Sequence, residues 1–95
     1  MKINELHIGD KPVSAISLFK GGQGNATAIR IMADEILKEH ITTVPALLLC
    51  IAGNAVYENE NDLKETLRPG DYISIEPMIK HWVKGLTESH LILFK

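Results

Sequence analysis

The sequence predicts an all-β sandwich or barrel, and two observations carry this prediction. Short apolar segments with alternating polarity recur along the chain, separated by turns rich in Gly, Pro and Asn. No segment has an unambiguous helical pattern. Many short strands bury their apolar side chains when two sheets pack face to face or when one sheet closes on itself.

The composition is typical of one globular domain. Of the 95 residues, 45% are hydrophobic and 23% are charged, and the formal net charge is -2. A chain of this length supports a single core, so we expect one domain over residues 1–95. The chain has no basic cluster that would follow the phosphates of a nucleic acid, and we expect no such partner.

The longest apolar run, residues 44–52, is interpreted as a buried strand. It contains Pro45 and is about half of the roughly 20 residues that a membrane span needs, so we expect no membrane partner. Cys50, the only cysteine, lies within this run and is predicted to be a small buried side chain. Residues 1–10 lack the apolar core of a secretory signal, and we expect a cytoplasmic protein.

The first half of the chain is predicted to form three strands. Residues 13–19 are strand-like, and the glycine-rich residues 21–25 turn the chain after them. Residues 28–40 also fit one face of a helix, but their first part alternates with period two and residues 33–35 suit a hairpin turn, so we favour two strands. Residues 1–12 form either a tail or an edge strand.

The second half begins with a predicted pair of hairpins. Residues 47–52 and 55–57 form the first, around a turn at residues 53–54. The acidic residues 58–62 are predicted to form the exposed tip of the second hairpin. We prefer this interpretation to a calcium-binding loop, because these residues lack the central glycine and distal glutamate of such a loop. A strand at residues 63–67 follows.

The segment from Leu67 to His81 is the clearest strand signal in the chain. Pro69 and Gly70 favour a turn, and residues 72–76 alternate as a strand that Pro77 ends. The alternation places Ile73 and Ile75 on one face and therefore predicts that Glu76 faces outward. Residues 82–83 and 91–94 are predicted to be the closing strands.

This segment resembles the second motif of the cupins, which are small β-barrels of the jelly-roll type. That motif begins with a glycine and ends with a histidine, and Gly70 and His81 occupy the two ends at the family's spacing. Glu76 and Met78 replace the proline and glycine between them. The resemblance covers residues 26–94 and implies an all-β, jelly-roll type cupin barrel.

The first cupin motif is matched at only two positions. In the family it contains two histidines, a glutamate and a glycine. Counting back from Gly53 places Ala46 at the glutamate, Thr42 at the second histidine and His40 at the first. Cupins that bind manganese, iron, zinc or nickel typically use three histidines and one carboxylate. The chain keeps His40 and His81 of this set, while alanine has no donor atom and a threonine hydroxyl is a poor ligand.

We therefore expect the barrel mouth to bind a small organic molecule without a tightly bound metal. The two histidines would supply hydrogen bonds within a mostly apolar pocket. The predicted ligand-binding residues are His40, Thr42, His81, Met32, Tyr57 and Met78.

Two other functions stay open. In the first, His40 and His81 hold a divalent transition metal for the dioxygenase, isomerase or decarboxylase chemistry that cupins carry. In the second, the barrel is a non-catalytic structural or sensor domain. We also expect a homodimer, because many cupins pair through their sheets and Leu47, Leu49 and Ile51 offer an additional apolar face.

Overall fold

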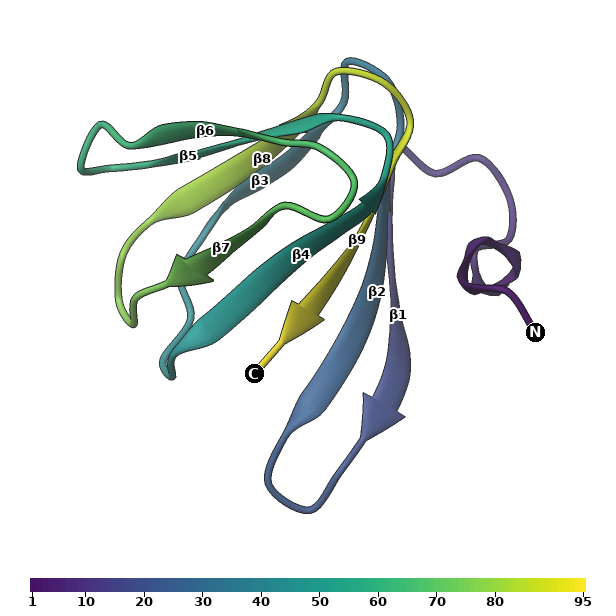
Figure 1. Ribbon diagram of the computed structural model, residues 1–95, viewed down its shortest axis with the longest axis horizontal. Coiled ribbons are helices and arrows are strands. Elements are labelled where there is room, and N and C mark those ends of the chain that lie inside the picture. The colour runs from purple at the N-terminus through teal and green to yellow at the C-terminus, as the bar shows by residue number, and fades with distance from the viewer.

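The computed structural model describes residues 1–95 and consists of nine strands and one short helix (Figure 1). The elements are the 3₁₀ helix η1 (Ile3–Leu6) and the strands β1 (Val13–Lys20), β2 (Asn25–Ile31), β3 (Ile36–His40), β4 (Ala46–Ala52), β5 (Ala55–Asn59), β6 (Lys64–Leu67), β7 (Tyr72–Ile75), β8 (His81–Gly85) and β9 (Ser89–Phe94). The predicted all-β class is confirmed. No helix is long and apolar enough to span a membrane.

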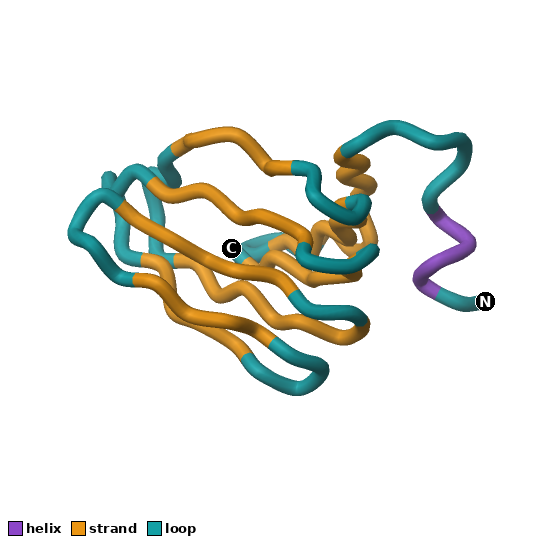
Figure 2. The backbone as a smooth tube through the Cα atoms, turned by 90° about the horizontal axis from the view of Figure 1, so that it is seen from above, coloured by secondary structure: helices purple, strands orange, loops and turns teal.

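The strands form two antiparallel sheets that lie against each other as two layers (Figure 2). The five-stranded sheet has the order β1-β2-β9-β4-β7, and the four-stranded sheet has the order β3-β8-β5-β6. β4 shows how the chain builds them: its burial alternates, with Ala46, Leu48 and Cys50 buried and Leu47 and Leu49 half-buried. Period-2 burial is what a strand requires when one face covers a core.

Two predicted hairpins are wrong, although their strands are confirmed. β2 and β3 flank residues 33–35 but belong to different sheets, and so do β4 and β5 around residues 53–54. The hairpin tip at residues 58–62 is confirmed, because β5 pairs with β6. Period-2 alternation identifies a strand but not its partner, since a strand buries the same face whichever sheet it joins.

The core lies between the sheets and draws on seven of the nine strands. Burial of a large apolar side chain contributes about 1.5–3 kcal/mol, so this cluster is the main source of stability. Its members are Ile29, Ile31, Ala46, Leu48, Cys50, Ala55, Tyr57, Leu67, Ile75, Val83 and Leu91.

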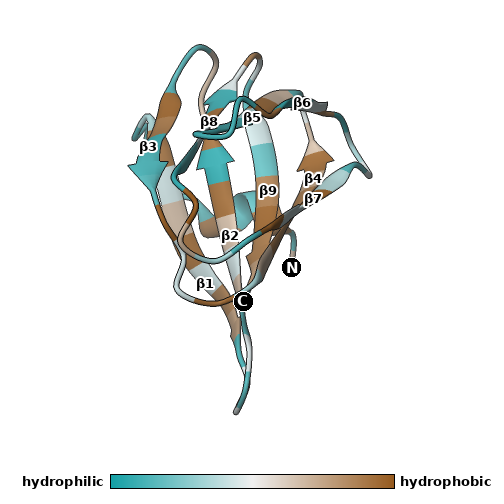
Figure 3. Ribbon diagram, turned by 90° about the vertical axis from the view of Figure 1, so that its left-hand side faces the viewer, coloured by the Kyte–Doolittle hydropathy of each residue, from teal (hydrophilic) through white to brown (hydrophobic).

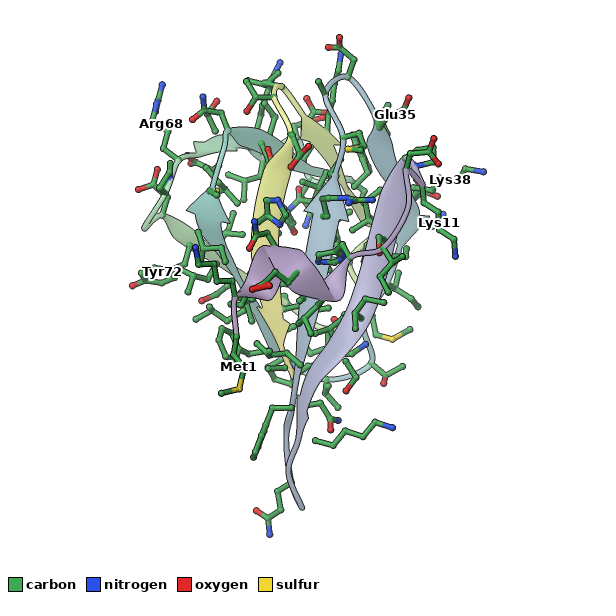
Figure 4. The ribbon with its side chains drawn as sticks, turned by 90° about the vertical axis from the view of Figure 1, so that its right-hand side faces the viewer. Met1, Lys11, Glu35, Lys38, Arg68 and Tyr72 are labelled. Atoms are coloured by element: carbon green, nitrogen blue, oxygen red, sulfur yellow. The ribbon has the colours of Figure 1, made fainter.

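Residues 1–12 are neither a tail nor an edge strand. Ile3 and Leu6 of η1 pack against Ala26, Ala28 and Ile92 on the outer face of the five-stranded sheet. The helix crosses β9 and β2 on that face (Figure 4). The edge is formed instead by β1, whose hairpin with β2 extends beyond the other strands and has a hydrophilic tip (Figure 3).

Candidate functional site at the barrel mouth

The two motif histidines meet where β3 ends and β8 begins. His40 is the last residue of β3, His81 is the first of β8, and the register pairs them directly. The connections at residues 41–45 and 76–80 lie at the same end, where Met78 N donates a hydrogen bond to Thr42 O at 2.8 Å. We call this end of the barrel the mouth.

The histidine pair is packed into an aromatic cluster. The His40 and His81 rings form a T-shaped pair with centroids 4.0 Å apart. The Tyr57 ring stacks on His81 with centroids 5.7 Å apart. His81 and Tyr57 are each only 1% exposed, whereas His40 is half-buried. Solvent therefore reaches the pair from the side of His40.

Backbone carbonyls orient both imidazole rings. His40 Nδ1 donates to Lys38 O at 2.8 Å, and His81 Nδ1 donates to Ile79 O at 3.0 Å. A carbonyl oxygen only accepts, so Nδ1 carries the proton and Nε2 of the neutral ring has a free lone pair. The Nε2 atom of His81 is buried without a partner in the protein, and so is the hydroxyl of Thr42.

Burial determines the protonation states of His81 and Tyr57. Desolvation lowers the pKa of His81, and the nearby His40 and Lys95 lower it further, while the bond to Ile79 opposes the shift. Desolvation also raises the pKa of Tyr57. At neutral pH, His81 is therefore an uncharged acceptor beside a protonated phenol.

The donor atoms at the mouth do not fit a resident transition metal. Such sites use about three or four protein ligands, and no group of three or more His, Cys, Asp or Glu side chains converges anywhere in the protein. Ala46 is buried and has no donor atom, and Glu76 is exposed, as its alternation predicts.

Two spaces of different size lie at the mouth. The interior cavity beside His40 and His81 has a volume of about 10 Å³, close to the minimum for one water. A much larger open groove of about 1100 Å³, which we call the mouth groove, lies between the tip of the β1–β2 hairpin and the mouth connections. Ile75 lines both spaces. The apolar residues of the groove are Leu18, Phe19, Ala26, Ala46, Leu47, Ile75 and Phe94, joined by Pro45 and Pro77.

Solved structures of similar fold are known. A cupin superfamily protein from Desulfitobacterium hafniense superposes with a TM-score of 0.85 at 17% identity, covering 98% of this chain and 84% of that chain. An RmlC-like cupin with a double-stranded β-helix fold from Methanocaldococcus jannaschii gives 0.78 at 14% identity, covering 90% and 81%. The chain has a cupin fold. KdgF from a Halomonas species gives 0.80 at 18% identity, covering 96% and 87%. No protein-family model and no curated protein matches the chain.

The cupin barrel brings most of the predicted site residues to one end. His40, His81 and Tyr57 are in contact, and the connections that carry Thr42 and Met78 are hydrogen-bonded to each other. Met32 lies at the opposite end, where its backbone carbonyl is close to Gly85, the last residue of β8.

Sequence reasoning missed a second polar cluster on the outer face of the cupin barrel. It consists of His7, Ser14, Arg30 and His90, each less than 9% exposed. The only signal in the sequence is that Arg30 interrupts the otherwise apolar run of residues 28–32. The strand register, which places Ser14 opposite Arg30 and Arg30 opposite His90, is needed to bring the cluster together.

Proposed function

We propose that this cupin-fold protein binds a small, predominantly apolar organic molecule at the barrel mouth. The observation that carries the proposal is that the mouth groove and the small cavity beside His40 and His81 share Ile75 as a lining residue. Ligand sites are concave and mostly apolar, and they contain a few polar groups that fix the orientation of the ligand. The groove and the pair together have these features.

The apolar part of the ligand would lie in the groove, and its polar group would face the histidines. Asn25, Ser74, Glu76 and Lys95 are the polar residues of the groove, and their charges are balanced. Neither histidine lines the groove, and Ile75 is the residue that lines both the groove and the cavity beside His81. We propose that Ile75 changes its side-chain rotamer when the polar group of the ligand reaches His81.

A pair of leucine variants tests the groove. We expect the fluorescent probe 1-anilinonaphthalene-8-sulfonate to bind wild-type protein saturably with one-to-one stoichiometry. Leu18 and Leu63 are each 40% exposed, but only Leu18 lines the groove. Leu18→Ser should raise the Kd of the probe about tenfold, while Leu63→Ser should leave it unchanged. Equal effects of the two substitutions would refute binding in the groove.

A second comparison tests the role of the histidines. Decanol and decanoate have the same apolar chain, but only decanol offers a hydroxyl proton to the free Nε2 lone pair of a neutral imidazole, because a carboxylate only accepts. We expect decanol to displace the probe better than decanoate, and His40→Phe to abolish that difference. If both compounds compete equally in wild type and variant, the histidine pair does not contribute to binding.

We also propose that two copies associate through the outer face of the five-stranded sheet. That face carries Ile16 at 37%, Ile51 at 36%, Tyr72 at 64% and Phe94 at 42% exposure, together with half-buried Leu49. η1 covers only the part around Ala26, Ala28 and Ile92. Exposed apolar surface of this extent is typical of an interface between proteins.

Sedimentation velocity at micromolar concentration tests the pairing. We expect a species of twice the 10.5 kDa chain mass, and Tyr72→Lys should shift it to the monomer by placing a charge in the interface. Phe94 belongs to both the face and the groove, so probe titrations at several protein concentrations show whether pairing covers the groove. A single 10.5 kDa species at all concentrations would contradict pairing.

A further inference from the structure

The polar cluster on the outer face contains a buried arginine without a counter-ion. Arg30 is 7% exposed, and its guanidinium makes one hydrogen bond, from Nη2 to Gly9 O at 3.1 Å. The ion pairs in the structure join Lys64 to Glu58 and His90 to Glu88, and neither includes Arg30. A buried charge is stable only when it is paired and hydrogen-bonded.

Two histidines beside Arg30 also have unpartnered nitrogen atoms. The His7 and His90 rings lie with centroids 5.7 Å apart. His7 Nδ1 shares a hydrogen bond with Ser14 Oγ at 2.8 Å, and His90 Nε2 donates to Glu88 Oε2 at 3.1 Å. Three further side-chain atoms, His7 Nε2, Arg30 Nε and His90 Nδ1, are buried without a partner in the protein.

We propose that His7, Arg30 and His90 form a binding site for a small oxyanion between the N-terminal segment and the five-stranded sheet. The anion would neutralise the guanidinium and accept hydrogen bonds from Arg30 Nε and from the two imidazoles when they are protonated. The site lies on the outer face of the barrel, away from the mouth, so it does not depend on the ligand site proposed above.

The proposed anion would also contact the N-terminal segment. His7 follows η1, and Gly9 O is bonded to Arg30. Residues 8–12 are exposed and form a thin cover, so a local opening of this segment would admit the anion. Once bound, the anion would hold His7, and with it η1, against β2 and β9.

Binding should be coupled to proton uptake. Desolvation lowers the pKa of His7, and the positive charge of Arg30 and the neighbouring His90 lower it further. Three side chains face His7: Ser14 on β1, Arg30 on β2 and His90 on β9. His90 is itself bonded to Glu88, which immediately precedes β9. An anion removes the repulsion, so it should bind more tightly as the pH falls below about 6.5.

Thermal unfolding with sulfate tests the proposal, because sulfate remains a dianion at every pH used. The samples contain millimolar sodium sulfate in chloride buffers of matched ionic strength, on either side of about pH 6.5. A ligand that binds only the native state raises the Tm saturably. We expect this rise in wild type, with a sulfate midpoint about tenfold lower on the acidic side.

Arg30→Gln and Arg68→Gln are the matched variants, because these are the two arginines of the chain and Arg68 is exposed. Arg68→Gln should keep the response to sulfate, and Arg30→Gln should lose it. Acetate in place of sulfate distinguishes a carboxylate ligand from a tetrahedral oxyanion. Equal Tm increases in both variants would mean a general salt effect, and no increase in wild type would also overturn the site.

Nuclear magnetic resonance of the wild-type protein covers the case in which Arg30→Gln does not fold. Sulfate should shift the ring resonances of His7 and His90 with one common midpoint and leave those of His40 unchanged. Shifts of all three rings, or of none, would contradict the proposal.

Discussion

The surroundings of His81 determine both the orientation of its ring and its protonation state. Its ring is held between His40 and Tyr57, its Nδ1 atom donates to Ile79 O, and burial lowers its pKa. The same burial that makes it a neutral acceptor makes its protonation unfavourable. A histidine in this state suits hydrogen bonding to a ligand better than holding a positive charge.

The free energy of unfolding should therefore fall in acid. The unfolded chain takes up a proton at about pH 6.5, whereas native His81 takes it up only at lower pH, so its contribution is complete above about pH 6.5 and is lost below it. His7 contributes in the same direction. In His81→Phe, which keeps a ring against Tyr57, urea unfolding at several pH values should show a shallower loss than in wild type. Identical pH profiles would argue against a neutral native His81.

The turn from β4 to β5 shows how an element carries the chain between sheets. Gly53 has a φ of 77°, and a Cβ atom there would clash with the carbonyl of Glu88 and with Ser89. Asn54 O accepts hydrogen bonds from Leu86 N and from Ser89 Oγ. The turn is thus packed against the connection from β8 to β9, and only glycine fits at its first position.

Two glycine substitutions separate backbone strain from this close packing. Gly70 also has a positive φ, 94°, but an added Cβ atom meets nothing within 4 Å. We expect Gly70→Ala to cost about 1 kcal/mol from strain alone and Gly53→Ala to cost about 3 kcal/mol, because strain and steric overlap add. Chemical denaturation provides both values. Equal costs would show that the turn relaxes freely.

At the scale of the whole molecule, the five-stranded sheet carries apolar side chains on both faces, and the two faces differ in what covers them. Its inner face belongs to the core, while its outer face is covered only partly, by η1. Leu48 and Leu47 are adjacent on β4 and point to opposite faces, with Leu48 at 3% exposure and Leu47 half-buried. The pair therefore compares the core with the proposed interface between copies.

Leu48→Ala should lower the free energy of unfolding by about 3 kcal/mol at any protein concentration, because it leaves a cavity in the core. Leu47→Ala should cost less than about 1 kcal/mol in dilute protein. Its cost should increase with concentration if its side chain lies between two copies, since association stabilises the folded state by mass action. Unfolding midpoints measured across a range of concentrations test both expectations.

Local patterns were sufficient to predict most strands. The turn at Pro69 and Gly70, the strand that begins at Tyr72 and the outward direction of Glu76 all follow from turn chemistry and period-2 alternation. Residues 33–35 were placed correctly as a turn, but their neighbours do not pair with each other. Pairing depends on which distant strand is available, and no local pattern contains that information.

Sequence patterns likewise predict only part of the candidate site. The sequence by itself determined an all-β chain with the cupin spacing of Gly70 and His81, and it placed His40 as the partner of His81. Only the tertiary structure decided that the interior beside this pair is nearly filled, that the larger space is a groove extending to the β1–β2 hairpin, and that His7, Arg30 and His90 meet on the outer face. The physical reason is that alternation specifies the face on which a side chain lies, whereas cavities and charge clusters arise from strands distant in sequence.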